Sequence, residues 1–344
     1  MEEKQALTIE QSTAAFLEDL ADARRSANTI RTYQNGLNNF RGFLEDAGLD
    51  PETETTAQLT EEHVRDFLSW LGAEGRAKAT INLYLAAVRA YIEFLDQQEL
   101  IPQINTSRLA GQLRKRAPRP GRRLPQFPRE EIEKVLEHAE VLAQTPAEDE
   151  EDHLINLRDR AFILVLADTG LRVHDACALK RKDIDWNEGR AIIIGKGDKE
   201  AVVRFSERSL AAMKHYLNER SGLDQSSGRQ LATLPVFTGH GPRNVTTENG
   251  IPVNKFRHMN TETGRAIIRR RVAEALGEEM VGQITPHSFR HYFVTIVLHA
   301  TGGNIRIAQE LARHSQISTT QRYTHLVSGE LDEAYHETFN ESGK

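Results

Sequence analysis

Four residues in the last quarter of the chain could together handle a phosphate group. His287 and Arg290 stand three positions apart, so they project from one face of a helix. A second histidine, His314, and a tyrosine, Tyr323, follow them along the chain. These residue types supply a nucleophile, a positive clamp and proton-transfer groups, and they indicate a site that attacks a phosphate.

The tyrosine needs help from its neighbours before it can act as a nucleophile. A phenol with a pKa near 10 is ionised to only about one part in a thousand at pH 7. It becomes reactive beside cations and a proton acceptor, whereas a lone tyrosine in a helix is ordinarily structural. Thr285 at the N-cap and Pro286 at the first helical position predict a helix start that puts His287 in the first turn. Unpaired backbone N–H groups and the positive end of the helix dipole make that turn a good place for an anion.

Two further cations precede this segment. Arg172 follows a Thr-Gly-Leu turn, and Asp175 lies one helical turn later, where it can orient Arg172 or a histidine. Lys196 lies at the tip of a predicted hairpin, from which a long flexible amine can reach into a groove. A capping histidine or a surface arginine would be structural if it stood alone, and the combination is what indicates chemistry.

Length and composition limit the class of protein. A chain of 344 residues can form two domains, and 39% hydrophobic and 27% charged residues are typical of a soluble globular protein. It has no apolar run of about 18 residues that could span a membrane, and its acidic N-terminus lacks the apolar core of a secretion signal. Its single cysteine, Cys177, excludes an intramolecular disulfide and a multi-cysteine metal site. We therefore expect a cytoplasmic protein without a membrane partner.

The charge distribution is uneven. The net charge of −6 argues weakly against a nucleic-acid partner, but residues 113–129 hold seven basic residues and no acidic one. This island is either a solvated linker or a segment that follows a DNA backbone. Because a candidate phosphate site lies downstream, we favour DNA contact. The predicted DNA-binding residues are Arg114, Lys115, Arg116, Arg119, Arg122 and Arg123.

Hydrophobic spacing divides the chain into two domains. Residues 1–112 carry three amphipathic stripes at helical spacing and a weaker helix at 9–22, which predict a small bundle of four helices. Residues 113–128 contain four prolines among the basic residues and are predicted to be an interdomain linker. Residues 129–344 make up the second domain, which holds the candidate catalytic residues.

The second domain is predicted to be mainly helical with one small sheet. Two β-rich runs, 190–194 and 201–205, flank a glycine-containing turn and predict a hairpin. The acidic insert 147–152 and most of residues 221–263 are expected to be loops. The expected helices are 157–168, about 264–277, 286–300 and 304–313.

Several segments resemble the ordered signatures of the tyrosine recombinase (phage integrase) family. They are Thr169-Gly170-Leu171-Arg172-Val173-His174-Asp175, Gly195-Lys196-Gly197-Asp198-Lys199-Glu200, His287-Ser288-Phe289-Arg290-His291 and Tyr323. The run Ser26-Ala27-Asn28-Thr29-Ile30-Arg31-Thr32-Tyr33 resembles the family's core-binding domain. The resemblance implies a mainly α (α+β) fold, with a SAM-like four-helix core-binding domain and a mixed helical catalytic domain with a small β-sheet. Together these domains would form a C-shaped DNA clamp.

The family resemblance implies a covalent mechanism. Tyr323 would attack the scissile phosphate, leaving a 3′-phosphotyrosyl link and a free 5′-hydroxyl. His287 would transfer the proton of the nucleophile, and Lys196 would protonate the departing 5′-oxygen. No metal or nucleotide cofactor is implied, because the covalent bond preserves the energy of the phosphodiester.

The resemblance also assigns residues that bind the phosphate. Arg172 and Arg290 would hold its non-bridging oxygens, since bidentate donors suit the developing charge. His314 would contact the phosphate, and Asp175 and His291 would support the catalytic side chains.

Two positions depart from the family pattern. The family often has Leu-Gly-His before the second histidine, where this chain has Leu311-Ala312-Arg313-His314. Arg313 in place of glycine either changes the helix end or adds a phosphate contact. The usual glutamate after the first arginine is Asp175, which keeps the charge and shortens the reach. Neither departure removes a catalytic group, so we expect an active enzyme.

A short helix is predicted at about 329–340. Leu331, Ala334, Tyr335 and Phe339 share one of its faces. This face either packs on its own domain or docks into a neighbouring protomer, as is common in the family. We favour docking, because the segment is terminal.

The leading hypothesis is a Xer-like site-specific recombinase that exchanges strands through a Holliday junction. Its expected partners are double-stranded DNA with paired inverted repeats and further copies of itself, forming a tetramer on DNA, alone or with a second recombinase. A type IB topoisomerase, which nicks and rejoins, and a DNA-binding relative without catalysis are the alternatives. The thirteen histidines form no convincing carboxylate–histidine ligand set, so we predict no metal site.

Overall fold

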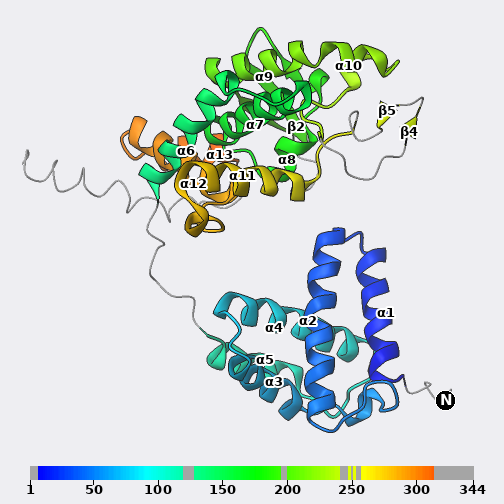
Figure 1. The fold of residues 1–344 in the computed structure, drawn as a ribbon. Coiled ribbons are helices and arrows are strands. Elements are labelled where there is room, and N and C mark those ends of the chain that lie inside the picture. Colours follow the sequence, from blue (N-terminus) through cyan, green and yellow to red (C-terminus); the bar gives the residue numbers. More distant parts are fainter. Residues whose placement is uncertain are drawn as a thin grey trace, which may run out of the picture. The chain divides into compact units, whose positions relative to one another are not determined.

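The computed structural model describes residues 7–118, 128–194, 200–240, 247–248, 251–252 and 257–313. The chain splits into two compact units, with the division between Arg123 and Leu124 (Figure 1). Each unit has its own buried apolar core, so each is described by itself. Within the described ranges, no helix is both long and apolar enough to cross a membrane.

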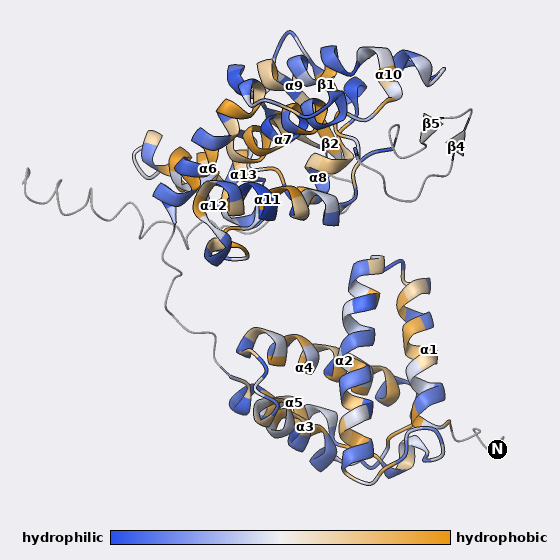
Figure 2. Ribbon diagram, in the orientation of Figure 1, coloured by the Kyte–Doolittle hydropathy of each residue, from blue (hydrophilic) through white to orange (hydrophobic). Residues whose placement is uncertain are grey.

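Helices build the N-terminal unit. Thr8, Ser26, Thr60 and Asn105 each cap one of them by accepting a hydrogen bond from the backbone N–H three residues later. Figure 2 shows hydrophilic and hydrophobic residues around these helices, as their amphipathic spacing predicts. The helices are α1 (Ile9–Asp22), α2 (Ala27–Asp46), α3 (Glu61–Ala73), α4 (Lys78–Gln97) and α5 (Thr106–Arg116), with a 3-10 turn η1 (Thr56–Gln58).

Apolar and aromatic side chains hold the N-terminal unit together. Phe40 and Phe67 are buried, and their ring centroids lie 5.1 Å apart in an edge-on arrangement. Tyr91 is fully buried on α4, and its hydroxyl lies 2.6 Å from Ser12 Oγ on α1. The polar end of this tyrosine is therefore satisfied inside the core.

Helix α5 corrects two sequence-based expectations. The spacing predicts a bundle of four helices and a linker that begins at residue 113, but α5 is a fifth helix and continues to Arg116. Leu109 and Leu113 stand four positions apart and are both buried, so this segment packs as an amphipathic helix. The sequence did not indicate this helix, because the basic residues that end it are typical of a solvated linker. Of the predicted DNA-binding residues, Arg114, Lys115 and Arg116 form the exposed last turn of α5, and Arg119, Arg122 and Arg123 lie outside the described residues.

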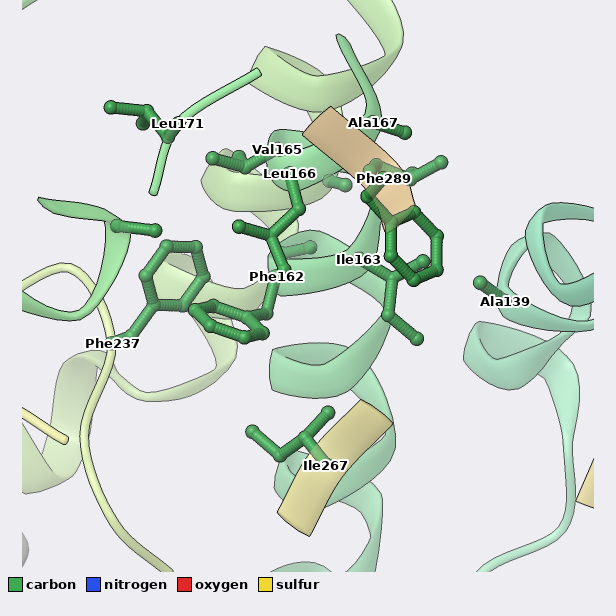
Figure 3. Close-up of a cluster of buried hydrophobic side chains, with 14 of the residues drawn as sticks. Ala139, Phe162, Ile163, Val165, Leu166, Ala167, Leu171, Phe237, Ile267 and Phe289 are labelled. Atoms are coloured by element: carbon green, nitrogen blue, oxygen red, sulfur yellow. The ribbon is translucent and has the colours of Figure 1, made fainter. Parts of the chain in front are cut away.

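Helix α7 (Glu150–Thr169) is the centre of the second unit. It contacts α6 (Arg129–Val141), α9 (Glu207–Glu219) and α12 (Pro286–Ala300). Nearly every residue from Leu157 onward is buried, so α7 is a core helix rather than an amphipathic surface helix. Figure 3 shows its side chains pointing outward to partners from several elements.

The other elements surround this core. The small sheet has the order β1-β2-β3 and is antiparallel, with Ile192 opposite Val202, so the hairpin expected from the sequence is present. The strands are β1 (Ile184–Asp185), β2 (Arg190–Ile194), β3 (Glu200–Arg204), β4 (Thr247–Glu248) and β5 (Ile251–Pro252). The further helices are α8 (Val173–Ala178), α10 (Ser221–Ser226), α11 (Thr261–Leu276) and α13 (Ile305–Ala312). The 3-10 turns are η2 (Leu142–Gln144), η3 (Arg181–Asp183), η4 (Leu231–Thr233) and η6 (Glu278–Met280).

Two expected loops are more ordered than the sequence indicated. Asp149 caps α7 by accepting a hydrogen bond from Asp152 N–H at 2.8 Å, so part of the acidic insert is the first helical turn. Acidic side chains are stabilising there, because the helix N-terminus carries partial positive charge. In the segment 221–263, Phe237 is fully buried against Phe162 at a centroid distance of 5.2 Å (Figure 3). This segment therefore contributes to the core even where it is neither helix nor strand.

Candidate active site

The structure describes three of the six predicted catalytic residues. Arg172, His287 and Arg290 lie in the described ranges, together with the predicted supporting residues Asp175 and His291. The remaining catalytic residues, Lys196, His314 and Tyr323, lie outside them, as does the predicted helix at 329–340. The described part of the site is formed by the C-terminal ends of α7 and α13 and by the first two turns of α12.

A glycine turn at the end of α7 presents the first arginine. Gly170 has φ of 59°, a left-handed conformation that suits glycine. A Cβ at this position would lie 2.5 Å from the Phe293 ring on α12, so a side chain would also clash. Thr169 Oγ1 accepts a hydrogen bond from Leu171 N–H at 3.1 Å and holds the turn closed. Arg172 follows at once as the N-cap residue of α8.

Arg172 is the exposed cation of the site. Its side chain is 54% exposed, and Nη1 lies 3.9 Å from Asp175 Oδ2. The same carboxylate has its Oδ1 3.5 Å from His174 Nδ1. Asp175 is thus close enough to attract Arg172 electrostatically, while the guanidinium remains accessible to a ligand from solvent.

Helix α12 begins where the sequence predicts. Thr285 is the N-cap and Pro286 takes the first helical position, and Ser288 Oγ accepts a hydrogen bond from Thr285 N–H at 3.0 Å. This capping arrangement fixes the first turn, which carries His287. Arg290 follows one turn later and points into the protein, since it is only 3% exposed.

Arg290 joins three chain segments at one guanidinium. Nη1 donates to the carbonyl of Gly170 at the end of α7, and Nη2 donates to the carbonyl of Ala312 at the end of α13. Carbonyl oxygens carry no net charge, so these bonds orient the guanidinium without neutralising it. A guanidinium has five N–H donors, so the two carbonyl bonds are compatible with an additional contact to a phosphate.

Two histidines on α12 stand next to this arginine. The rings of His287 and His291 have centroids 4.3 Å apart and planes 84° apart. Burial of the ring lowers the pKa of His287, and the charges of Arg290 and Arg172 lower it further, although the residue as a whole keeps contact with solvent. Burial also lowers the pKa of His291 to about 4, with His287 and Arg290 acting in the same direction. Both rings are therefore neutral at pH 7, which is the state in which a histidine can accept a proton.

Arg313 is a member of this cluster. It is the left-handed C-cap of α13, and its Nη2 lies 3.4 Å from the Gly170 carbonyl that also accepts from Arg290. Burial lowers the pKa of Arg313 to about 10, with Asp175 raising it and Arg172 lowering it. The sequence marked this residue only as a departure from a glycine, and the proximity to a turn 143 positions away was not visible there.

Asp168 is a supporting residue that the sequence did not single out. Its carboxylate accepts a hydrogen bond from Ser206 Oγ and another from Arg208 Nε, the latter at 2.8 Å. Ser206 is the N-cap of α9 and comes two residues after β3 ends. These bonds tie the start of α9, which closely follows β3, to the end of α7, next to Gly170. The only sequence signal was an acidic residue directly before the Thr-Gly-Leu-Arg segment.

The described residues contain no group of three or more histidine, cysteine or acidic side chains arranged to hold a metal ion. Cys177, the single cysteine, is buried, and burial raises the pKa of its thiol to about 12. The thiol is therefore protonated at pH 7 and does not take part as a nucleophile.

Comparison with known proteins shows similarity over most of the chain. The model of the phage integrase family matches residues 127–329, and that of the phage integrase N-terminal SAM-like domain matches residues 13–99. A tyrosine recombinase XerD from Rhizobium meliloti is 32% identical over 319 residues, covering 92% of this chain and 91% of the relative. A tyrosine recombinase XerC from Thermodesulfovibrio yellowstonii is 29% identical over 311 residues, covering 90% and 89%.

Solved structures share the fold. The XerH site-specific recombinase bound to palindromic difH substrate aligns with a TM-score of 0.64 and 21% identity, covering 96% of this chain and 85% of that one. A lambda integrase dimer bound to a COC′ core site aligns with a TM-score of 0.62 and 17% identity, covering 93% and 77%. The two family models account for both units, and the relatives extend over nearly the full length. The chain therefore belongs to the phage integrase family, and it is a Xer-like tyrosine recombinase that cuts and rejoins DNA at specific sites.

Proposed function

We propose that this recombinase cleaves DNA through Tyr323, which attacks the scissile phosphate and leaves a 3′-phosphotyrosyl link and a free 5′-hydroxyl. One observation carries the proposal: Arg172, His287 and Arg290 converge on the Gly170 turn from two helices that lie far apart in the sequence. Two guanidiniums and a neutral imidazole are the groups needed to bind a phosphodiester and to take a proton from an attacking hydroxyl.

Each remaining residue has a proposed place in the reaction. Arg172 and Arg290 bind the non-bridging oxygens, and His287 accepts the tyrosine proton. Lys196 protonates the departing 5′-oxygen, which prevents that oxygen from leaving as an unstable alkoxide. Strand rejoining reverses these steps, with the 5′-hydroxyl of a second strand as the nucleophile.

Three further residues support these groups. His314 contacts the phosphate, and Asp175 and His291 hold the neighbouring catalytic side chains. The Arg172–Asp175 distance of 3.9 Å and the His287–His291 ring contact are consistent with that role.

The DNA partner is proposed from charge and from the relatives. Arg114, Lys115 and Arg116 are exposed at the end of α5, and basic residues continue through the following segment to Arg123. A row of guanidiniums and amines fits a DNA backbone, because phosphate contacts provide most of the sequence-independent affinity. The XerH recombinase and the lambda integrase are bound to site DNA in their solved structures. We infer that the two units of this chain clamp a duplex carrying inverted repeats, and that they do so in the cytoplasm.

Strand exchange requires paired sites, and we propose that four copies assemble on them and pass through a Holliday junction, with or without a second recombinase. The face formed by Leu331, Ala334, Tyr335 and Phe339 would dock into a neighbouring copy. Sedimentation should find a monomer without DNA and a tetramer on paired sites. A stable tetramer without DNA would contradict this assembly.

The chemistry is tested by trapping the covalent intermediate. The purified protein is incubated with nicked fragments of its host genome, so that the short strand beyond the cut diffuses away and rejoining is blocked. Covalent adducts are captured and their DNA ends sequenced. We expect adducts at a few short inverted repeats, and none with Tyr323→Phe.

Tyr84→Phe is the matched control, because it removes a tyrosine hydroxyl from α4, outside the residues proposed for catalysis and docking, and should still form adducts. Adducts that form without sequence preference would favour a type IB topoisomerase activity. DNA binding without any adduct would contradict the proposed nucleophile and leave a binding protein.

A further inference from the structure

Arg313 adopts a backbone conformation that is unusual for its residue type. Among the described residues, three that are not glycine have positive φ: Arg24, Glu99 and Arg313. Arg24 and Glu99 are exposed, whereas Arg313 is partly buried at the end of α13. A glycine would adopt φ of 56° without strain. Arg313 therefore keeps a backbone conformation that favours glycine, while its side chain points into the protein.

The guanidinium of Arg313 is poorly satisfied where it lies. Nε and Nη1 are buried and have no hydrogen-bond partner in the part of the chain that the structure describes. Nη2 reaches the Gly170 carbonyl at 3.4 Å, which is long for a charged donor. Two buried donors of a charged group without an acceptor are costly, so Nε and Nη1 are suited to an acceptor with negative charge.

The surroundings identify the chemistry of that acceptor. Arg290 donates to the same Gly170 carbonyl, and Arg172 follows two residues after it. Asp175 is the carboxylate paired with Arg172, at 3.9 Å. Among the described residues, three guanidiniums thus lie at or next to this turn, and Asp175 is a carboxylate beside them. A dianionic or monoanionic group with several oxygens fits such a cluster, and a phosphodiester is such a group.

We propose that Arg313 is a third guanidinium that binds the DNA phosphate held by Arg172 and Arg290. This rests on the proposed function, because it assigns a further ligand to the same phosphate. Arg313 contributes through its charge and its planar fork of donors. The alternative is that Arg313 only steadies the Gly170 carbonyl and has no contact with DNA.

Binding to DNA gives a test that does not depend on cleavage. In a Tyr323→Phe background, affinity for a short duplex is measured between about 50 and 200 mM salt, where each phosphate contact contributes about 0.9 to the slope of log affinity against log salt. Arg313→Gln should lower the slope by about one such contact. Arg306→Gln is the matched control, because Arg306 lies on the same helix, is 86% exposed and pairs with Glu310. Equal slopes for the Tyr323→Phe chain with and without Arg313→Gln would overturn the proposal, even if no adduct can be formed.

A second pair of measurements separates phosphate binding from structural support. Arg313→Gly removes the guanidinium and relieves the left-handed strain, so its thermal midpoint should stay equal or rise. Its rate of adduct formation on a nicked duplex carrying the recovered site should fall by about 10²–10³-fold, as expected for a lost donor to the reacting group. A midpoint that falls together with the rate would mean that Arg313 is structural.

A scissile phosphate without negative charge tests whether Arg313 acts through its attraction to that charge. With a methylphosphonate at the scissile position, one non-bridging oxygen and its negative charge are absent. Most of the rate difference between the unchanged chain and Arg313→Gly should then disappear. A difference that persists in full would overturn the proposal, since Arg313 would be acting by positioning the Gly170 turn. Failure of the unchanged chain to form adducts would instead contradict the proposed cleavage, and the salt slopes would still decide the role of Arg313.

Discussion

The catalytic unit buries arginines in two different ways. Around Asp159, which is fully buried, Arg158 Nη2 and Arg271 Nε each donate at 2.8 Å, and Arg270 donates as well. Around the Gly170 turn, Arg290 donates to backbone carbonyls and Arg313 lies within reach of one. The first region surrounds a carboxylate with guanidiniums, and the second surrounds a neutral backbone turn with them.

A second carboxylate cluster follows the first pattern. Arg220 is fully buried and donates from Nε to Asp224 Oδ2 at 3.0 Å, from Nη1 to Tyr216 Oη at 2.9 Å and from Nη2 to the Pro235 carbonyl at 2.8 Å. These bonds hold the segment after residue 234 against α9. The guanidinium of Arg220 thus fixes the backbone at Pro235, which lies in neither a helix nor a named strand.

The difference between these regions lies in where the positive charge can act. A buried carboxylate offsets part of the charge of the arginines bound to it and holds them in place, so the Asp159 and Asp224 clusters serve the fold. The carbonyls at the Gly170 turn orient Arg290, and the exposed Arg172 that follows this turn can attract an anion. The same residue type is therefore structural or functional according to its acceptor, and variants in each region test this difference.

The largest effect is expected at Asp159. Asp159→Asn leaves the charges of Arg158, Arg270 and Arg271 without their shared carboxylate, which should cost about 3–5 kcal/mol of unfolding free energy. Denaturant unfolding is followed by the fluorescence of Trp186, with Trp70→Phe present so that only the catalytic unit reports. Glu310→Gln on the surface is the control and should change little. A loss below about 1 kcal/mol would place Asp159 among ordinary surface pairs.

Replacing Arg290 should reduce the rate of DNA cleavage more than it reduces the stability of the fold. Arg290→Gln should lower the rate of adduct formation by about 10²–10³-fold, because a charged donor to the phosphate is lost. The unfolding free energy should fall less, by about 1–3 kcal/mol, from the two carbonyls that lose a donor. Single-turnover adduct assays and denaturant unfolding measure the two effects. Arg265→Gln, at an exposed position, is the control, and a variant that lost stability but kept its rate would reverse the assignment.

The histidines at the turn should make stability depend on pH. The folded-state pKa of His291 is about 4, below its ordinary value of 6.5, so the unfolded chain binds the proton more readily. The stability from the neutral ring is present above about pH 6.5 and is lost as pH falls toward 4. Unfolding free energies of the unchanged chain and of His291→Asn should converge as pH falls through this window. A difference that is constant from pH 7 to 4 would contradict burial of a neutral histidine.

The smallest effect is expected for an exposed pair. Arg129 Nε lies 2.9 Å from Glu133 Oε1 on α6, with both side chains well exposed. Arg129→Gln should cost about 0.3–0.5 kcal/mol, which added salt should reduce. Thermal unfolding at low and high salt measures this. A cost comparable to that of Asp159→Asn would remove the contrast between a buried and an exposed ion pair.

Local signals in the sequence located most helices. The Thr285-Pro286 start and the apolar spacing that follows predicted a helix over 286–300, and α12 spans Pro286–Ala300. The interval 304–313 matches α13 to within one residue at each end. Helix α5 was missed because its basic residues concealed the buried pair Leu109 and Leu113. Caps and periodicity are properties of neighbouring residues, so they can be read from the chain alone.

The types and order of the reactive residues, and the single helix that carries His287 and Arg290, follow from the local sequence. Which acceptors these residues have depends on the tertiary structure. That Arg290 donates to Gly170, 120 positions away, and that Arg313 reaches the same carbonyl, depends on how α7, α12 and α13 pack. Hydrogen bonds to carbonyls leave no trace in residue type, because every residue carries one. The motifs therefore supply the charged residues, and packing sets where their guanidiniums lie at the Gly170 turn.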